Sequence, residues 1–406
     1  MKSVIFLLTT VLMLSPSPSS FAADAGVSEL AAAYNTFAFK LLKELNTETE
    51  SGNLFVSPYS AATALQMVAN GAAGQTKAEM ESVLATSGLS QETLNVASKA
   101  VANLLNAPDT NVILSTANAL WYRQSAQIKP EFLAENQRYF GSTIKPLDFG
   151  NVPAAEAEIN QWASDQTHGR ITGIANGMID PHFTDLVLAN AIYFKGKWRD
   201  PFDKELTKER PFHAGNGTSK KVPMMEMSSD FTYRKGTGYQ AVRLPYMGGD
   251  VVMYVFLPDP NFSPTKLLQI MNGDSWRRVT VPGFTIHKGL LVLPKVKLEN
   301  TFDLVPTLKA LGMKLAFNNL KSKPDPDFSG MFKDPHFISE VRQNTFVEVG
   351  EEGTEAAAVT AITMAPSAII MNPPKPFEMI VDRPFLFAIV DVRSEMILFM
   401  GVVNDL

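Results

Sequence analysis

The alternation of apolar and polar side chains predicts a strand near the C-terminus that runs directly into an unusual segment. Phe346-Val347-Glu348-Val349 alternates apolar with polar positions, as a half-buried strand does. A run of small residues follows from Glu351 to Ala361, and Pro366 and then 373–376 close it, because proline continues neither a helix nor a strand ladder. Alanine alone would favour a helix, but these flanks favour a strand that continues into the run.

Continued at the strand period of two, the run separates into two different faces. One face has only uncharged side chains, most of them small, namely those of Thr354, Ala356, Ala358, Thr360 and Ile362. The other face carries the single charge, Glu355, together with Ala357 and Val359. Such a segment can enter the middle of an existing sheet without a charged side chain opposing burial. The sequence therefore predicts a strand that is not yet part of its sheet.

The run from Glu351 to Ala361 resembles the hinge of the reactive-centre loop of serpins, the serine protease inhibitor family. Further fragments resemble the family in the same order along the chain, over about Leu30 to Leu406. They are Asn53-Leu54-Phe55-Val56-Ser57-Pro58-Tyr59-Ser60 with 71–76, Asn190-Ala191-Ile192-Tyr193-Phe194-Lys195-Gly196-Lys197-Trp198, Leu293-Pro294-Lys295-Val296-Lys297-Leu298-Glu299, and Asp382-Arg383-Pro384-Phe385-Leu386-Phe387 with 399–401. One fragment alone would be weak, but their common order makes the resemblance specific.

The resemblance implies an α+β serpin fold with three β-sheets, about eight or nine helices and an exposed reactive-centre loop at about 351–376. A length of 406 residues would by itself suggest two or three domains. No Gly/Ser linker, charge block or repeat divides the chain, and we therefore expect a single domain over 23–406. We expect it to be a monomer.

The first residues predict a secretory signal peptide over 1–22. Lys2 is followed by an apolar stretch from Val4 to Leu14 and by small residues around Ala22. Because about 20 apolar residues are needed to span a bilayer, this stretch is too short for a membrane anchor. We therefore expect a secreted or periplasmic protein. The chain has no cysteine, so neither disulfides nor a lipidated cysteine is expected.

Charge and motifs exclude several other classes of function. The net charge is −5, or −6 once Lys2 leaves with the signal peptide, which gives no attraction to nucleic acid or anionic membranes. The five histidines, at 168, 182, 213, 287 and 336, share no metal-ligand spacing, and neither a phosphate-binding loop nor a Gly-x-Ser-x-Gly nucleophile motif occurs. We expect no metal, no cofactor and no enzymatic activity. The stretch from Leu94 to Asn106 corresponds to the heparin-binding helix of some serpins but offers only Lys99, which argues against a heparin activator.

The family resemblance implies an irreversible inhibitor of a serine protease. The protease would cleave the exposed loop as a substrate and form an acyl-enzyme; the hinge would then insert into the large sheet and trap the covalent complex. The hinge residues are Glu351, Glu352, Gly353, Thr354, Glu355, Ala356, Ala357, Ala358, Val359 and Thr360. We expect Glu351 and Glu352 to be solvated. Gly353 is expected to act either as a pivot or as an ordinary turn residue.

The family's usual spacing from the hinge places the reactive bond at Ser367-Ala368, with Met364 and Met371 as alternative cleavage points. The stretch from Thr363 to Met371 contains neither Lys nor Arg, which disfavours a trypsin-like target. Elastase-, chymotrypsin- and subtilisin-like proteases fit better, and a papain-like cysteine protease stays open.

The resemblance also marks positions that control the opening of the sheet. It implies a shutter cluster of Ser57, Ser60, Asn190 and Gln343, where most serpins have a histidine in place of Gln343, and a breach residue, Trp198. Gly350 stands where an asparagine is usual. The alternatives are that the cluster only satisfies buried polar groups and that Trp198 only fills the core. Among functions, a non-inhibitory carrier or chaperone and an exported hydrolase are the alternatives to inhibition.

Overall fold

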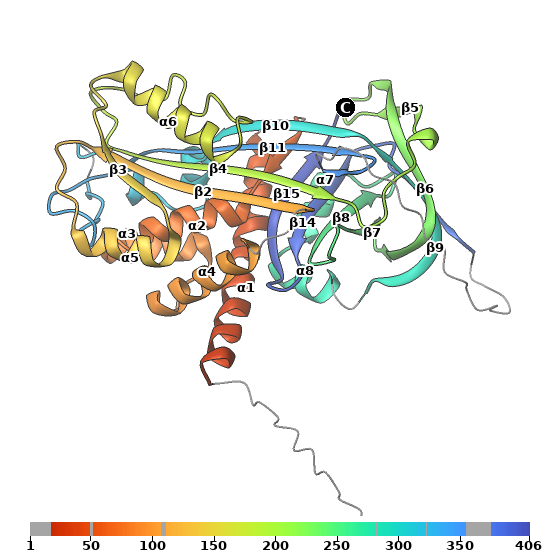
Figure 1. The fold of residues 1–406 in the computed structure, drawn as a ribbon, viewed down its shortest axis with the longest axis horizontal. Helices are drawn as coiled ribbons and strands as arrows, with labels where there is room; N and C mark the ends of the chain where they lie inside the picture. The colour runs from red at the N-terminus through yellow and green to blue at the C-terminus, as the bar shows by residue number, and fades with distance from the viewer. Residues whose placement is uncertain (1–17, 49–51, 107–110, 281–282, 322, 355–374) are drawn as a thin grey trace, which may run out of the picture.

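The computed structural model describes residues 18–48, 52–106, 111–280, 283–321, 323–354 and 375–406. Nine α-helices lie within these residues (Figure 1). They are α1 (Pro18–Glu48), α2 (Pro58–Ala69), α3 (Gly74–Leu84), α4 (Gln91–Leu105), α5 (Pro130–Phe140), α6 (Val152–Gln166), α7 (Pro264–Ile270), α8 (Gly273–Thr280) and α9 (Val305–Ala310), with short 3-10 turns η1 (Lys204–Leu206) and η2 (Leu315–Phe317).

The strands of the described residues form two hydrogen-bonded sheets. The six-stranded sheet has the order β10 (Val296–Asp303), β11 (Ile338–Gly350), β12 (Gly353–Thr354), β4 (Leu186–Lys197), β2 (Val112–Arg123) and β3 (Thr143–Leu147). The nine-stranded sheet has the order β1 (Leu54–Val56), β15 (Met396–Val403), β14 (Phe385–Asp391), β8 (Val251–Pro258), β7 (Tyr239–Pro245), β6 (Ser219–Gly236), β9 (Thr285–Pro294) and β13 (Phe377–Ile380), with β5 (Lys208–His213) beside β6.

The α+β class is confirmed, and two of the three expected sheets are continuous with each other. The strand that joins them is β6, which pairs with β5 over 219–224, with β9 over 224–233 and with β7 over 232–236. The long strand β6 thus belongs to two of the expected sheets, and its successive pairings join them into one nine-stranded sheet.

Both faces of the six-stranded sheet are buried at its centre. Along β4, Leu186, Leu188 and Ile192 belong to the main core, in which α2 packs. The intervening Val187, Ala189 and Ala191 belong to a second apolar cluster that includes Ile159 of α6. Because alternate side chains of a strand point to opposite faces, β4 lies between α2 and α6 (Figure 1). Burial on both faces explains why this strand is nearly continuously apolar.

The expected signal peptide lies largely outside the described residues, and it stays a prediction. The first described helix, α1, begins at Pro18, inside the predicted segment 1–22. None of the helices in the described part of the chain is long and apolar enough to span a membrane.

Candidate functional site

The end of β11 turns back and enters the six-stranded sheet. Strands β4 and β11 pair directly and in parallel up to Tyr193 and Phe346. Beyond that pair they separate, and β12 lies between them (Figure 1). Thr354 faces Gly196 of β4 on one side and Val349 of β11 on the other. The start of the predicted hinge is therefore already a strand of this sheet.

Gly353 is the position where β12 approaches β4 most closely. Its φ is +147°, a conformation that side-chain-bearing residues rarely adopt. A Cβ atom built there would lie 2.1 Å from the carbonyl oxygen of Gly196 and 2.7 Å from the Cα of Lys197. Both contacts are with backbone, which cannot move aside cheaply. Glycine is thus required for β12 to pair with β4.

Thr354 lies on the buried face of the sheet, as the period of two predicts. Its side chain is fully buried, and its hydroxyl oxygen is 2.8 Å from the hydroxyl oxygen of Tyr246. Burial raises the pKa of Tyr246, so this phenol stays protonated and forms a neutral hydrogen bond with Thr354. The contact fixes the inward orientation of the first inserted side chain.

The expectation that Glu351 and Glu352 are solvated is wrong. Glu351 is only 8% exposed, and its carboxylate accepts hydrogen bonds from Lys295 Nζ at 3.0 Å and Thr207 Oγ1 at 3.0 Å. Burial opposes ionisation, but hydrogen bonds from its own backbone amide, Lys295 and Thr207 outweigh it and hold the pKa of Glu351 below its ordinary value. Glu352 forms an ion pair with Lys204. Two lysines therefore hold the turn that precedes β12.

Trp198, the residue that follows β4, contacts the same turn at 350–352. Its indole N–H donates to the carbonyl oxygen of Gly350 at 2.9 Å, and its backbone N–H donates to that of Glu352 at 2.9 Å. The ring stacks on Tyr246 with centroids 4.4 Å apart. Trp198 is 3% exposed, so the same side chain both packs in the core and hydrogen-bonds to the turn that leads into the hinge. A Cβ at Gly350 would meet nothing closer than Lys295 Cε at 3.8 Å, so glycine is not required there.

The four residues of the expected shutter lie together in one buried cluster. Gln343 is at its centre: its Nε2 donates to Asn190 Oδ1 at 2.8 Å and to the carbonyl oxygen of Ser57 at 2.9 Å, and its Oε1 accepts from Ser57 N at 2.9 Å. Asn190 Nδ2 also donates to Ser60 Oγ. The side chain of Ser57 caps α2 and donates to the carbonyl oxygen of Leu398 at 2.7 Å. The cluster joins β4, β11 and α2, and its members satisfy one another.

Several contact residues of this site were not found from the sequence. Asn118 of β2 faces Asn190 and accepts from its Nδ2 at 2.6 Å. Lys295, Lys204, Thr207 and Tyr246 are each separated from the hinge by more than 50 residues, and nothing local to them indicates a partner. The remaining hinge residues 355–360 and the predicted cleavage points Ser367, Ala368, Met364 and Met371 lie outside the described residues.

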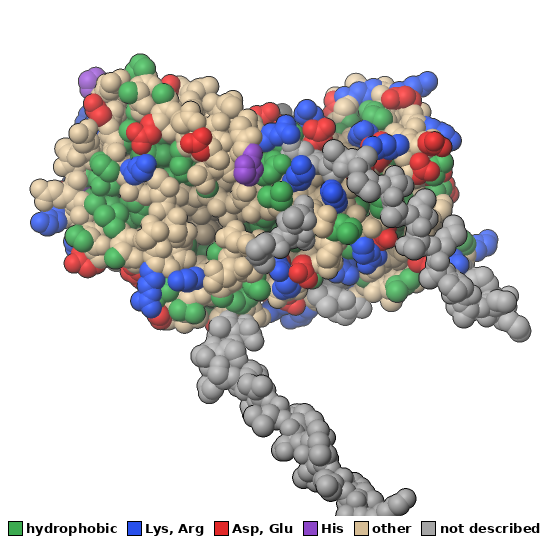
Figure 2. Space-filling model, in the orientation of Figure 1, with side chains coloured by type: hydrophobic (Ala, Val, Ile, Leu, Met, Phe, Trp, Pro, Cys, Tyr) green, Lys and Arg blue, Asp and Glu red, His purple; other side chains and the backbone are tan. Residues whose placement is uncertain are grey.

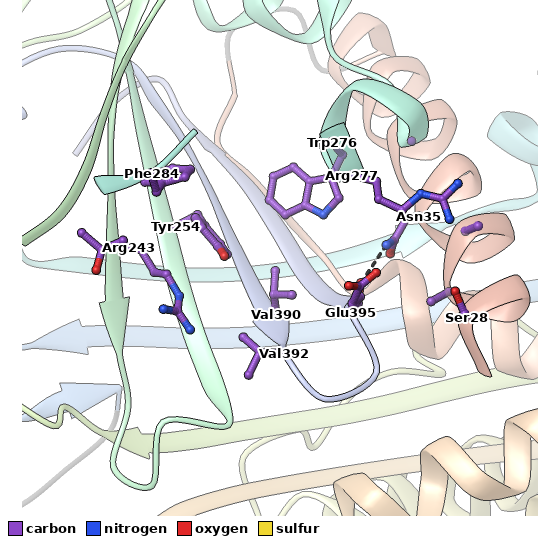
Figure 3. A pocket seen from close by; sticks show the side chains of 14 residues that line it. Ser28, Asn35, Arg243, Tyr254, Trp276, Arg277, Phe284, Val390, Val392 and Glu395 are labelled. Carbon is purple, nitrogen blue, oxygen red and sulfur yellow. Dashed lines mark hydrogen bonds between the residues drawn. The ribbon is translucent and has the colours of Figure 1, made fainter. Parts of the chain in front are cut away.

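A separate cavity of about 310 Å³ lies between α1, α8 and the nine-stranded sheet. Figure 3 shows Tyr254, Trp276 and Phe284 around it, with Arg243 and Arg277 among the polar side chains. Asn35 of α1 donates to the carbonyl oxygen of Glu395 at 2.8 Å across one side. The sequence did not predict this cavity, because its lining comes from segments distant along the chain.

The surface offers no support for a heparin-binding helix in the expected place. Lys99 is the only basic residue of α4. On the face shown in Figure 2, Lys and Arg side chains lie among Asp and Glu rather than in one uniform patch. The expectation that heparin is not an activator stays a prediction.

The chain resembles known proteins in both sequence and structure. The family model "Serpin (serine protease inhibitor)" matches residues 32–406. A leukocyte elastase inhibitor of Bos taurus is 37% identical over 92% of this chain and 99% of that protein, and an uncharacterized serpin-like protein of Methanosarcina mazei is 33% identical over 93% and 87%.

Solved structures give the same result. Native tengpin, a thermophilic serpin, has a TM-score of 0.81 and 28% identity, with 97% of this chain and 96% of that chain covered. Thyroxine-binding globulin in complex with thyroxine has a TM-score of 0.80 and 26% identity, with 92% and 98% covered. With the inserted hinge, the buried polar cluster and a family match over nearly its whole length, the chain belongs to the serpin family.

Proposed function

We propose that the protein is an irreversible suicide-substrate inhibitor of an elastase-, chymotrypsin- or subtilisin-like serine protease. The observation that carries this proposal is β12, which already occupies the space between β4 and β11 with two residues of the hinge. A loop that has begun to pair with both neighbours needs only to continue along the same ladders.

The length of β4 matches the length of the loop between Thr354 and the predicted reactive bond. Because Thr354 faces Gly196 in an antiparallel ladder, each further residue of the loop faces the preceding residue of β4. Met364 would then face Leu186, the first residue of β4. Pro366 follows two residues later and cannot donate to a ladder. Full insertion would thus carry Ser367 just past the far end of the sheet.

The chemistry follows from this displacement. The protease serine attacks the carbonyl carbon of Ser367; the bond to Ala368 breaks, the serine proton passes to the leaving amine, and an ester joins Ser367 to the protease. Insertion then moves the esterified protease from one end of the sheet to the other before water cleaves the ester. The leukocyte elastase inhibitor among the relatives supports an elastase-like target.

The test uses the purified mature protein with pancreatic elastase, chymotrypsin, subtilisin and trypsin. We expect a complex that survives denaturing electrophoresis with at least one of the first three, and a released peptide whose mass places the cleaved bond at Ser367-Ala368, Met364 or Met371. Cleavage of the loop by all of them without any complex would count against inhibition, and papain would then be tried for the cysteine-protease alternative.

Export and a monomeric state belong to the same proposal. We expect the N-terminus of the mature protein to begin at Ala23, which intact-mass measurement of protein recovered from the producing cell would show. Light scattering during gel filtration should give the mass of a single chain. An unprocessed N-terminus would argue for a protein that stays inside the cell.

A small-molecule carrier is the second candidate, favoured by the cavity beneath α8 (Figure 3). Three aromatic rings and two arginines suit an aromatic carboxylate, and thyroxine-binding globulin shares the fold. Trp276 is 4% exposed and lines the cavity, so its fluorescence should report a bound ligand. Saturable quenching by thyroxine that disappears in Arg277→Met would favour a carrier; no quenching up to millimolar thyroxine would reject this class of ligand.

A further inference from the structure

The chain contains four Asn-Gly pairs, at 70–71, 176–177, 216–217 and 272–273. In such a pair the backbone nitrogen of the glycine can attack the side-chain amide of the asparagine, because glycine has no side chain to obstruct the approach. Asn70 is half-buried and donates to Asn95 Oδ1 at 3.0 Å, and Asn272 accepts from the backbone N–H of Ser275 at 2.9 Å at the start of α8. Asn176 and Asn216 lie in exposed turns.

Asn160 of α6 fixes the orientation of the Asn176 side chain. Asn160 Oδ1 accepts from the backbone N–H of Ala175 at 2.8 Å, so the amide nitrogen of Asn160 is the group that faces Asn176. This nitrogen donates to Asn176 Oδ1 at 2.8 Å. A donor at that oxygen withdraws electron density from Cγ and stabilises the negative charge that develops on the oxygen during attack. The side-chain amide of Asn176 is thus prepared as an electrophile.

The attacking nitrogen of the same pair has a carboxylate beside it. The backbone N–H of Gly177 donates to Glu156 Oε1 at 2.8 Å, which is within the distance over which a base takes a proton directly. Glu156 and Asn160 both belong to α6, and their spacing of four residues places them on one face of the helix. One helix face therefore presents a base to the nucleophile and a donor to the electrophile.

The pair at 216–217 provides a comparison that lacks only the carboxylate. Asn216 Oδ1 accepts from the backbone N–H of Thr218 at 2.9 Å and from its hydroxyl at 2.6 Å, so this electrophile is also activated. The N–H of Gly217, however, donates to the carbonyl oxygen of Ala214 at 3.0 Å. A backbone carbonyl is a far weaker base than a carboxylate. Glu156 is thus the feature that distinguishes the two exposed pairs.

We propose that Asn176-Gly177 is a site of spontaneous covalent modification, with Glu156 as the base and Asn160 as the donor to the developing oxyanion. The Gly177 nitrogen bonds to Asn176 Cγ while its proton passes to Glu156. The bond from Cγ to Nδ2 then breaks, the proton passes from Glu156 to the leaving nitrogen, and ammonia departs. Solvent water opens the resulting five-membered imide at either carbonyl and gives aspartate or isoaspartate. This inference is independent of protease inhibition.

The modified turn is the one that anchors α6 through apolar contacts. Ile174, Ala175 and Met178 belong to the second apolar cluster together with Ile159 of α6. Both products add a carboxylate one residue before the N–H that Glu156 accepts, and isoaspartate also lengthens the backbone by a methylene group. The reaction therefore introduces like charge at the point where the turn is held to the helix.

The test follows the full-length protein during prolonged incubation in neutral buffer. Peptide mapping measures the fraction of asparagine converted at each Asn-Gly pair, and enzymatic methylation of isoaspartate identifies the product. Glu156→Gln keeps an oxygen that can accept from Gly177 N–H but removes the base. Asn160→Asp keeps the acceptor for the N–H of Ala175 and removes the donor to Asn176. Glu158→Gln, which makes the first change two residues along the same helix, is the matched control.

We expect Asn176 to convert at least about threefold faster than Asn216 in the wild type, and Glu156→Gln to slow conversion at Asn176 about tenfold while Asn216 is unaffected. Asn160→Asp should also slow it, and Glu158→Gln should change it by less than about twofold. In guanidinium the advantage of Asn176 over Asn216 should disappear, because it depends on the folded geometry.

Three results would overturn the inference. The first is conversion at Asn216 that equals or exceeds conversion at Asn176 in the folded wild type. The second is unchanged or faster conversion at Asn176 in Glu156→Gln, which would mean that Glu156 restrains the turn and does not act as a base. The third is a preference for Asn176 that persists in the unfolded chain.

Discussion

Thr354 and Tyr246 meet inside the core, with their hydroxyl oxygens 2.8 Å apart and neither side chain exposed to solvent. The contact joins a residue of the predicted hinge to a residue 108 positions earlier in the chain. It marks the buried face of β12, on which the loop would continue if it inserts as proposed.

If the protein inhibits a protease as proposed, Thr354→Arg should turn it into a substrate of that protease. A guanidinium at this position would be buried beside a neutral phenol and would have no anion to pair with, which costs several kcal/mol. Insertion would slow, and the protease would complete hydrolysis. Titration against the target protease, followed by denaturing gels, should show the covalent complex reduced at least about tenfold while loop cleavage persists. Thr354→Ser, which keeps the hydroxyl, is the control; an undiminished complex in the arginine variant would contradict the proposed role of the hinge.

Gly353→Ala should expel β12 from the sheet. The added Cβ would lie 2.1 Å from the carbonyl oxygen of Gly196, and the required φ of +147° is strained for alanine. We expect a loss of about 1–3 kcal/mol in the free energy of unfolding if the strand stays in place, or faster amide hydrogen exchange at Thr354 if it leaves. Gly350→Ala is the matched control, because its Cβ meets nothing closer than 3.8 Å. Equal behaviour of the two variants would remove the steric argument.

Acid should release the hinge through Glu351. Its pKa is lowered in the folded protein from an ordinary value of 4.5, so the stability that it contributes is present above pH 4.5 and is lost as the pH falls through the lower folded value. The emission of Trp198, which contacts Gly350 and Glu352, should report the change. Glu351→Gln should flatten the pH dependence of stability below pH 4.5. Lys204→Met, which removes the partner of Glu352 instead, should leave that dependence in place.

Gln343→His should make the native state sensitive to mild acid. Gln343 Oε1 accepts from Ser57 N at 2.9 Å, and a protonated imidazole has no acceptor to offer there. The buried histidine would therefore keep a folded pKa below its ordinary value of about 6.5, and stability would fall as the pH drops below that value. Thermal unfolding between pH 8 and 5 should show this slope in the variant and not in the wild type. A variant that is flat over this range would mean that the cluster rearranges around the new side chain.

The residues that could be assigned from the sequence are those whose role depends on local pattern. The period of two placed Thr354 on the buried face, whereas the α+β fold and the polar cluster of Ser57, Ser60, Asn190 and Gln343 were implied by the resemblance to serpins. The environment of Glu351 could not be found in this way, since it depends on Lys295 and Thr207, which reach the hinge only after the two sheets have formed. For the same reason a local reading of two adjacent glutamates predicts solvation, whereas the folded chain buries Glu351, leaves Glu352 half-buried and pairs each with a lysine.

Under the proposed mechanism, the two residues of β12 change the kinetics of trapping a protease. Starting a new strand inside a sheet requires separating two paired neighbours before any new pairing compensates, which makes initiation the slow step of such a process. Here β4 and β11 are already separated at one end, and β12 lies between them and pairs with both. After cleavage, the loop would only have to extend β12, which is already paired at its start. The slowest stage of strand insertion would therefore be complete before insertion has to compete with hydrolysis of the acyl-enzyme.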